Sequence, residues 1–525
     1  MTTRLDSATP VAAPRPGARA AVLRTVASVV ALVAGTGAAA HAQSADRQQG
    51  APAARVTRPQ DAPRDAAPRL RRVDRPPVST AVLDTALPRI MREAKVVGLD
   101  IAVVNGDTTV YDRVLGLRDR EAGVPADTGT VFEAASLTKP LFAYLVMGLA
   151  RDGVLDLDAP LVRYLEYPDI AHDPRSRQVT ARMVLSHSSG LSGNRQGSRV
   201  DFVYDPGRYF NYSAEGIFYL QLVVERLLGR SLDVAMQERV FTPLGMAHSS
   251  MVWTPAAERN HATGYDYHDQ RAEKWKPDKP GAAASLHTTA GDYARFLREM
   301  LTGARLGPRW VAEMLRPQVL VIPGDSTLAW SLGFGVDRTT AAPAYFQWGS
   351  NLGVQNFVVL HPTQRVGVVY LANSEHGLQV KDDVVALTVG GRYSIDKFLT
   401  YDQCNSLTRA LVAAYDARGV DAALALYGER RRRDPGDMSP RWLDELAAHA
   451  AGAGRVQGLQ DAARLLALNA TYYPTAWQTH VALADAYAKL GDRQRAAAAV
   501  LEAVRHCPTP ELLIGPLREL GVKWR

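Results

Sequence analysis

Ser136 and Lys139 are the pair of residues whose types and spacing could perform nucleophilic chemistry. Residues three apart on a helix share one face and lie one turn from each other. A serine hydroxyl is a weak nucleophile until a neighbouring base removes its proton, and a lysine can be that base when burial lowers its pKa. The pair therefore predicts an acyl-transfer site in which Ser136 attacks and Lys139 activates it.

The residues after Ser136 indicate where the pair lies on its helix. Pro140 is tolerated only in the first turn, because its ring and its missing N–H disturb deeper turns, and the apolar run 141–150 predicts a buried helix. Ser136 would thus lie at the helix N-terminus, where its backbone N–H can donate to an oxyanion. A second such pair, Ser394 with Lys397, has no buried helix after it, and we attribute it to chance.

The strands and helices that position Ser136 and Lys139 begin and end with two predicted hairpins. Residues 97–103 and 108–114 flank an Asn-Gly-Asp turn, and residues 356–360 and 366–371 flank a His-Pro-Thr-Gln turn. Helices are predicted between them at 137–151, 214–229, 231–241 and 290–302. Strands at both ends with helices between predict an α+β domain over residues 81–400, in which an antiparallel sheet is flanked by helices and contains an inserted, mainly helical region.

Residues 401–525 have no strand signals and are rich in Ala, Leu and Arg. When Pro508 is taken as position 32 of a 34-residue unit, the characteristic large, small, aromatic, turn and packing positions hold Leu483, Ala484, Tyr487, Gly491, Ala496 and Ala503. Weaker copies end at Pro474 and Pro435. This spacing resembles the tetratricopeptide repeat. It predicts an all-α helical repeat domain that could bind a peptide or protein partner.

The N-terminal region has the pattern of an export signal followed by a linker. Residues 1–42 combine basic residues, a short apolar run at 26–34 and a small-residue cleavage site. The run is shorter than the roughly 20 residues that span a bilayer, so no stable membrane span is expected; an uncleaved anchor is the alternative. Residues 43–80 are rich in Pro, Ala and Arg and predict a disordered linker. We therefore expect an exported bacterial protein, periplasmic or extracellular.

Composition excludes several other classes of protein. The 525 residues carry a net charge of +7, but residues 1–80 hold 12 Arg and 5 Asp, which leaves 49 basic and 49 acidic groups elsewhere. A basic nucleic-acid-binding face on the folded part is therefore not expected. Cys404 and Cys507 are too few for a disulfide framework or a Cys-based metal site, and they could form one bridge or none. The histidines show no metal-ligand spacing, so no metal or cofactor is predicted.

The segment FEAASLTKPLFAYLVMGLARDGVLDLDAPLVRYL around Ser136 resembles the nucleophile helix of the penicillin-recognising serine hydrolases. That superfamily contains class C β-lactamases, DD-peptidases, D-aminopeptidases and related esterases. Further landmarks follow in the superfamily's order at 179–191, 205–214, 241–246, 286–296 and 331–335. The resemblance covers about 80–380. It implies a β-lactamase/transpeptidase-like fold, an acyl-enzyme mechanism and a small-molecule or peptide substrate.

The resemblance also implies roles for individual residues. Tyr212 takes the place of the superfamily's tyrosine, which would accept the Ser136 proton and pass it to the leaving group; a nearby lysine cation would favour its phenolate. Gly349 matches a motif glycine that would let the substrate backbone approach the strand closely. Gln347 then occupies the place usually held by Lys or His, and Ser350 would supply the second oxyanion N–H. Gln347, Gly349 and Ser350 are the implied substrate-binding residues.

Two departures from the superfamily pattern bear on the substrate. Ala214 stands where the tyrosine motif usually has Asn, and Gln347 stands where a cation usually recognises a carboxylate. A lost charge-assisted contact costs about 1.5–3 kcal/mol. The sequence therefore favours a serine hydrolase acting on esters or amides, with a β-lactamase or a D-amino-acid/DD-peptidase as the alternative. A second alternative is a catalytically silent, penicillin-binding-like scaffold that works through its helical repeats, against which the intact Ser136, Lys139 and Tyr212 argue.

Overall fold

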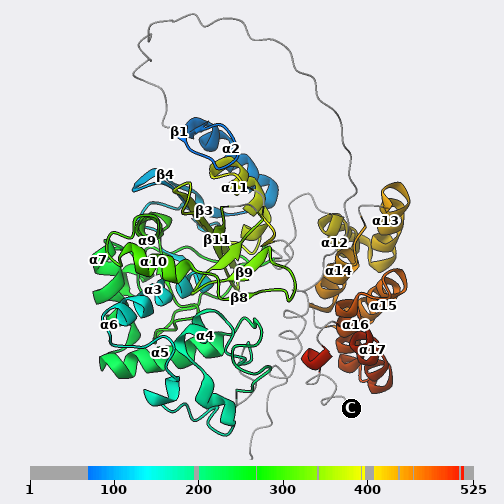
Figure 1. The fold of residues 1–525 in the computed structure, drawn as a ribbon. Helices are drawn as coiled ribbons and strands as arrows, with labels where there is room; N and C mark the ends of the chain where they lie inside the picture. The colour runs from blue at the N-terminus through cyan, green and yellow to red at the C-terminus, as the bar shows by residue number, and fades with distance from the viewer. Residues whose placement is uncertain are drawn as a thin grey trace, which may run out of the picture. The chain divides into compact units, whose positions relative to one another are not determined.

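The computed structural model describes residues 69–193, 200–267, 269–339, 342–391, 393–395, 407–435, 438–452, 455–507 and 510–513 (Figure 1). The predicted signal at 1–42 and most of the predicted linker lie outside these residues, as do Cys404 and Pro508. The chain separates into two compact units, with the division after Ala413. None of the described helices combines the length and the apolar character that crossing a membrane requires.

The last part of the predicted linker is ordered. β1 (Arg69–Leu70) pairs antiparallel with β2 (Val78–Ser79), and the Ser79 hydroxyl caps the following helix α2 (Thr80–Ala94) by accepting a backbone N–H. The second residue of β1 is completely buried. The prediction of a disordered linker is therefore corrected for residues 69–80, because a buried leucine and a serine N-cap give this segment stabilising contacts.

A nine-stranded antiparallel sheet forms the centre of the first unit, in the order β5-β4-β3-β13-β12-β11-β10-β9-β8. Its strands are β3 (Gly98–Asn105), β4 (Thr108–Asp119), β5 (Val124–Pro125), β8 (Val319–Leu320), β9 (Leu328–Trp330), β10 (Gly335–Asp337), β11 (Ala344–Asn351), β12 (Val354–His361) and β13 (Val366–Ala372). The two predicted hairpins are β3–β4 and β12–β13, and β3 pairs with β13. This confirms the predicted α+β fold, in which the two ends of the domain close one sheet.

Helices cover both faces of this sheet. α9 (Ala290–Thr302) packs across β3, β4 and β13, whereas α2 and α11 (Lys381–Thr388) lie together on the other side (Figure 1). Every residue of β13 is buried, and so is every residue of β3 except the last. A strand that is buried on both faces needs a continuous run of apolar residues, which explains why these two strands lack polar alternation.

The helical region between the two hairpins contains a helix that is buried on nearly all sides. α3 (Thr138–Arg151), α5 (Ala214–Leu228) and α6 (Leu232–Met236) begin within one residue of the predicted positions. In α3, 11 of 14 residues are buried, and the main hydrophobic core extends from this helix to the sheet. A helix that is apolar on nearly all sides must lie inside the domain, so the start of α3 is a position shielded from water.

Every secondary-structure element among the described residues of the second unit is a helix. These are α12 (Leu407–Arg418, which begins in the first unit), α13 (Val420–Arg433), α14 (Arg441–Gly452), α15 (Val456–Tyr472), α16 (Trp477–Lys489), α17 (Arg493–His506) and a short 3-10 turn, η8 (Pro510–Leu513). α14, α15, α16 and α17 each pack on the next helix. Gly491 joins α16 to α17 with φ +81°, a conformation that favours glycine. The all-helical fold is confirmed, and the repeat type remains a prediction.

Candidate active site

Ser136 lies in a tight connection between a short strand and the buried helix α3. β6 (Phe132–Glu133) pairs with β7 (His287–Thr288), and a 3-10 turn over Ala135–Leu137 then leads into α3. Ala135 has φ +49°, in the left-handed region that non-glycine residues rarely adopt. Such a conformation persists only where the surroundings enforce it, so the fold holds Ser136 in one defined position at the start of the helix.

Lys139 is an almost completely buried amine next to the Ser136 hydroxyl. Its residue is 2% exposed, its Nζ lies 2.9 Å from Ser136 Oγ, and it donates a hydrogen bond of 2.8 Å to the carbonyl of Ala283. Burial lowers the pKa of Lys139 to about 7, because surroundings of low polarity disfavour the ammonium form. Near neutral pH a large share of Lys139 is therefore an amine whose lone pair can take the serine proton.

Tyr212 lies on the other side of the serine hydroxyl. Its OH hydrogen-bonds with Ser136 and accepts a hydrogen bond of 3.2 Å from Gln347 Nε2, while Lys139 Nζ lies 4.9 Å from its ring centroid. Burial raises the pKa of Tyr212 above its usual value. Burial therefore favours the protonated phenol over the phenolate that the sequence suggested, because desolvation disfavours a charged oxygen.

Two further rings hold Tyr212 in place. The rings of Tyr212 and His187 have centroids 4.2 Å apart, and Trp348 stacks on Tyr212 at 5.3 Å with an interplanar angle of 27°. His187 Nδ1 accepts the Ser213 N–H at 3.1 Å, and burial keeps the pKa of His187 well below its usual value. His187 is therefore a neutral packing partner of Tyr212.

The predicted substrate-binding residues Gln347, Gly349 and Ser350 lie on β11. Gln347 is completely buried; its Nε2 donates to Tyr212, and its Oε1 accepts the Trp348 N–H at 3.1 Å. Both ends of the amide are therefore bonded within the protein. In this structure the Gln347 side chain orients Tyr212, and its contact with substrate stays a prediction.

Gly349 and Ser350 serve the site through their backbone. A Cβ on Gly349 would lie 2.2 Å from the carbonyl oxygen of Ala134, so the glycine accommodates the chain's own turn before Ser136. That it also lets a substrate backbone approach stays a prediction. Asn351 pairs with Val354 across a two-residue turn. Because hydrogen-bonded and non-bonded pairs alternate in an antiparallel ladder, the N–H of Ser350 points away from β12 and is available to a ligand.

The structure thus brings Ser136, Lys139, Tyr212 and Gln347 together in one hydrogen-bonded group. Sequence reasoning missed the contribution of Ala283, which acts through a backbone carbonyl that no side-chain motif could reveal. It also missed the packing of His187 and Trp348 on Tyr212. The only available signal was position: His187 lies inside the landmark at 179–191, and Trp348 lies between Gln347 and Gly349.

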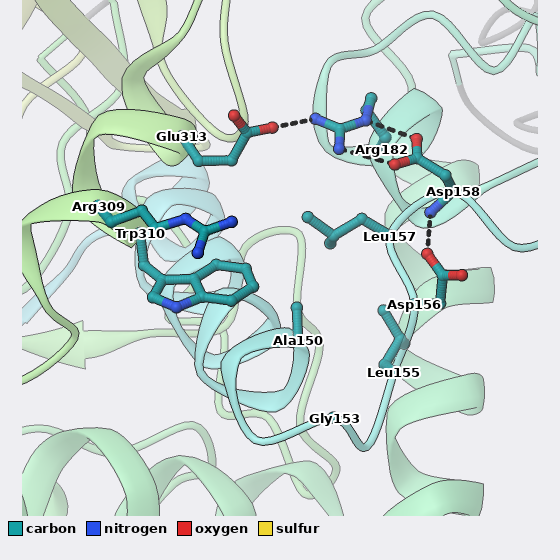
Figure 2. Close-up of a pocket in the computed structure, with 10 residues that line it drawn as sticks. All are labelled: Ala150, Gly153, Leu155, Asp156, Leu157, Asp158, Arg182, Arg309, Trp310 and Glu313. Carbon is teal, nitrogen blue, oxygen red and sulfur yellow. Dashed lines mark hydrogen bonds and ion pairs between the residues drawn. The ribbon is translucent and has the colours of Figure 1, made fainter.

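A separate pocket of about 480 Å³ lies between the end of α3, the loop 153–158, α4 (Ala181–Leu185) and α10 (Pro308–Leu315) (Figure 2). At its edge the Arg182 guanidinium forms ion pairs of 2.6 Å with Asp158 and 2.5 Å with Glu313. None of the predicted site residues lines this pocket. These two ion pairs neutralise the charge of Arg182 within the protein. We therefore assign the candidate chemistry to Ser136 and not to this pocket.

Comparison with known proteins adds an independent line of evidence. Residues 83–389 match the family model described as Beta-lactamase. The chain is 29% identical to Penicillin-binding protein 4 of Amycolatopsis lactamdurans, over 54% of this chain and 82% of that protein. It is also 29% identical to Esterase EstB of Burkholderia gladioli, over 53% of this chain and 86% of that protein.

Solved structures show the same fold at lower identity. An octameric penicillin-binding protein homologue from Pyrococcus abyssi superposes with a TM-score of 0.53 and 21% identity, over 64% of this chain and 82% of that one. A class C beta-lactamase superposes with a TM-score of 0.52 and 19% identity, over 59% of this chain and 94% of that one. These matches establish the architecture of the first unit.

Proposed function

The chain belongs to the Beta-lactamase family and is a serine hydrolase, and from this we propose that it is exported and hydrolyses uncharged esters or amides through an acyl-enzyme on Ser136. The observation that carries the proposal is the distance of 2.9 Å between Ser136 Oγ and the Nζ of the buried Lys139. A base within hydrogen-bonding reach of a hydroxyl, with a pKa close to the working pH, is what activation of a serine requires.

In the proposed reaction, Lys139 accepts the proton of Ser136 as Oγ attacks the acyl carbon. The backbone N–H groups of Ser136 and Ser350 stabilise the negative oxygen of the tetrahedral intermediate. The protonated Tyr212, oriented by Gln347, donates its proton to the leaving group and recovers one from Lys139. Water then hydrolyses the acyl-enzyme by the same groups acting in reverse.

The preference for an uncharged substrate follows from Gln347. A carboxylate-bearing substrate is best recognised by a cation, whereas the Gln347 amide carries no charge and has both ends occupied. Similarity to an esterase supports this choice. Similarity to a penicillin-binding protein supports the alternative of a β-lactamase or a D-amino-acid/DD-peptidase.

The third candidate is a catalytically silent scaffold whose helical repeats bind a peptide or protein partner. The arrangement of Ser136, Lys139 and Tyr212 disfavours it, because a silent protein has no need to keep a buried lysine with a lowered pKa. Export rests on the pattern of residues 1–42, and the repeat partner rests on the spacing within 401–525.

Intact-mass spectrometry of the full chain tests the proposed function. The protein is mixed with short-chain p-nitrophenyl esters, a penicillin, a cephalosporin, a D-Ala-D-Ala peptide and a fluorophosphonate. We expect the ester and fluorophosphonate adducts on wild type and on Ser394→Ala, the control from the second Ser-x-x-Lys, and no adduct on Ser136→Ala. Adducts from the β-lactams alone would favour the second candidate, and no adduct from any probe would favour the silent scaffold.

The pH dependence of ester hydrolysis should report the titration of Lys139. The ammonium form cannot accept a proton, and the pKa of Lys139 is about 7, so kcat/KM should increase with pH through about 7 and level off above it. The measurement is a rate profile from pH 5.5 to 9 with an uncharged ester. A profile that is flat over this range would remove Lys139 from the role of base.

Replacing Tyr212 by phenylalanine should lower kcat by about 100-fold, the effect of losing one general acid. The control is Tyr219→Phe, because Tyr219 is a buried tyrosine whose hydroxyl would lose a hydrogen bond of 2.8 Å to the carbonyl of Leu165. Steady-state kinetics and melting temperatures of both variants separate the two effects. Equal losses of kcat in the two variants would mean that Tyr212 contributes only to packing.

A further inference from the structure

We propose that Glu133 is a positioning residue that sets the separation of the two oxyanion-stabilising N–H groups, those of Ser136 and Ser350. Glu133 lies three residues before Ser136 and is 3% exposed. This inference rests on the proposed function, because it concerns the same site. It assigns a role to the Glu133 carboxylate, which takes no part in the steps of the proposed reaction.

The carboxylate of Glu133 joins the nucleophile turn to the end of β11. Its Oε1 accepts a hydrogen bond of 2.6 Å from Asn351 Nδ2, and its Oε2 lies 3.2 Å from the Nζ of Lys274. Asn351 is the residue directly after Ser350. One side chain therefore links the strand that leads to Ser136 with the residue adjacent to the second oxyanion donor.

The backbone of Glu133 forms a second link, which connects β6 to β12, the strand paired with β11. Its carbonyl accepts a hydrogen bond of 3.0 Å from Asn356 Nδ2, and Asn356 lies opposite Gly349 on β12. Next to it, the carbonyl of Ala134 occupies the space that a side chain on Gly349 would need. We call these contacts of Glu133 with Asn351, Asn356 and Lys274, together with the Ala134–Gly349 packing, the Glu133 clamp.

Lys274 supplies the charge that makes a buried carboxylate tolerable at this position. Its side chain is 10% exposed, and burial lowers its pKa although the attraction of Glu133 opposes that change. An isolated buried carboxylate would be costly, but an ion pair with additional hydrogen bonds can be held. Each carboxylate oxygen of Glu133 therefore has a partner, and these two contacts hold the side chain in one position.

The Glu133 clamp matters for catalysis because the two oxyanion donors must be placed precisely. Donors must lie about 2.7–3.1 Å from the developing oxyanion, and a misplacement of about 1 Å can cost about 100-fold in rate. Ser136 and Ser350 come from separate elements, so their separation depends on what joins those elements. Among the described side chains, Glu133 forms a direct bond from the nucleophile strand to the residue after Ser350.

Asn351→Ala tests the clamp without disturbing the buried ion pair. We expect kcat/KM for an ester to fall about 10- to 100-fold. The ratio of kcat/KM for an ester to that for the matching thionoester should also fall, because a loosened site discriminates less between oxygen and the larger sulfur. The control is Asn373→Ala, which removes a buried amide bonded at 3.1 Å to the carbonyl of Leu117 outside the clamp; it should leave the ratio unchanged.

Two double variants separate positioning by Glu133 from its charge. Glu133→Gln with Lys274→Met removes both charges but keeps an oxygen for Asn351, so its ester-to-thionoester ratio should stay close to that of wild type. Glu133→Ala with Lys274→Met removes that oxygen and should behave like Asn351→Ala. Melting temperatures show whether each variant folds.

The outcomes distinguish this inference from the proposed function. If the wild type forms an adduct on Ser136 but Asn351→Ala and the Glu133→Ala double variant keep the wild-type ratio, the clamp is overturned and the proposed function stands. If the wild type forms no adduct with any probe, both are overturned. A reduced ratio in those two variants, with wild-type ratios in Asn373→Ala and the Glu133→Gln double variant, supports the clamp.

Discussion

Replacing Ser136 by alanine should lower kcat for ester hydrolysis by about 10⁶-fold, the scale of loss when a serine nucleophile is removed from a preorganised site. Among the described residues, the hydrogen-bond partners of the Lys139 amine are Ser136 Oγ and the Ala283 carbonyl, and a carbonyl cannot be the nucleophile. The remaining rate would come from substrate binding and the oxyanion donors alone. Steady-state kinetics with an enzyme-free blank measures the change.

The matched comparison for this prediction is Ser394→Ala. Ser394 is also followed three residues later by a lysine, but it is buried and its hydroxyl bonds to the carboxylate of Asp337 at 2.8 Å. That variant should keep kcat within about two-fold, in line with a site remote from the chemistry. A Ser136→Ala protein with more than a few per cent of wild-type activity would show that another group is the nucleophile.

Lys139→Met should lower kcat by about 10⁴-fold, the upper range for the loss of a general base, and should at the same time make the protein more stable. Lysine titrates near 10.5 in an unfolded chain and Lys139 near 7 in the fold, so the unfolded state binds the additional proton between these values. Wild-type stability therefore increases with pH across that window. Methionine fills a similar volume without a charge and removes the dependence.

Melting curves at pH 7 and pH 9 check the stability half of this prediction. The variant should melt several degrees above wild type at pH 7, and the difference should shrink at pH 9, where less of the penalty for burying the amine remains. A variant that is both inactive and less stable at pH 7 would indicate that Lys139 is mainly a packing residue.

The central chemistry could be predicted from the sequence because it depends on local spacing. Ser136, Lys139 and Pro140 lie within five residues, and helix geometry alone places the first two on one face. That strands from the two ends of the domain share one sheet was predicted from two hairpins that each have their own turn signal; that β3 and β13 are the strands that join these hairpins was not predicted. Patterns that are complete within a short window are the ones that a single sequence reveals.

The parts that could not be predicted depend on contacts between distant residues. Glu133 and Asn351 are 218 positions apart, and nothing near either residue indicates that they meet. The raised pKa of Tyr212 follows from its burial, which is a property of the folded protein and not of the motif. The close approach of Ala134 to Gly349 could not be predicted, because it is set by tertiary packing.

The pairing of β3 with β13 has a consequence for how the first unit assembles. Leu99 pairs with Ala372, about 270 positions later, so the middle of the sheet cannot close until nearly the whole unit has been synthesised. Closing so long a loop delays the gain from strand pairing, and chains rich in such distant contacts fold slowly. Any truncation that removes β13 leaves β3 with an open edge at the middle of the domain, ready to pair with another chain.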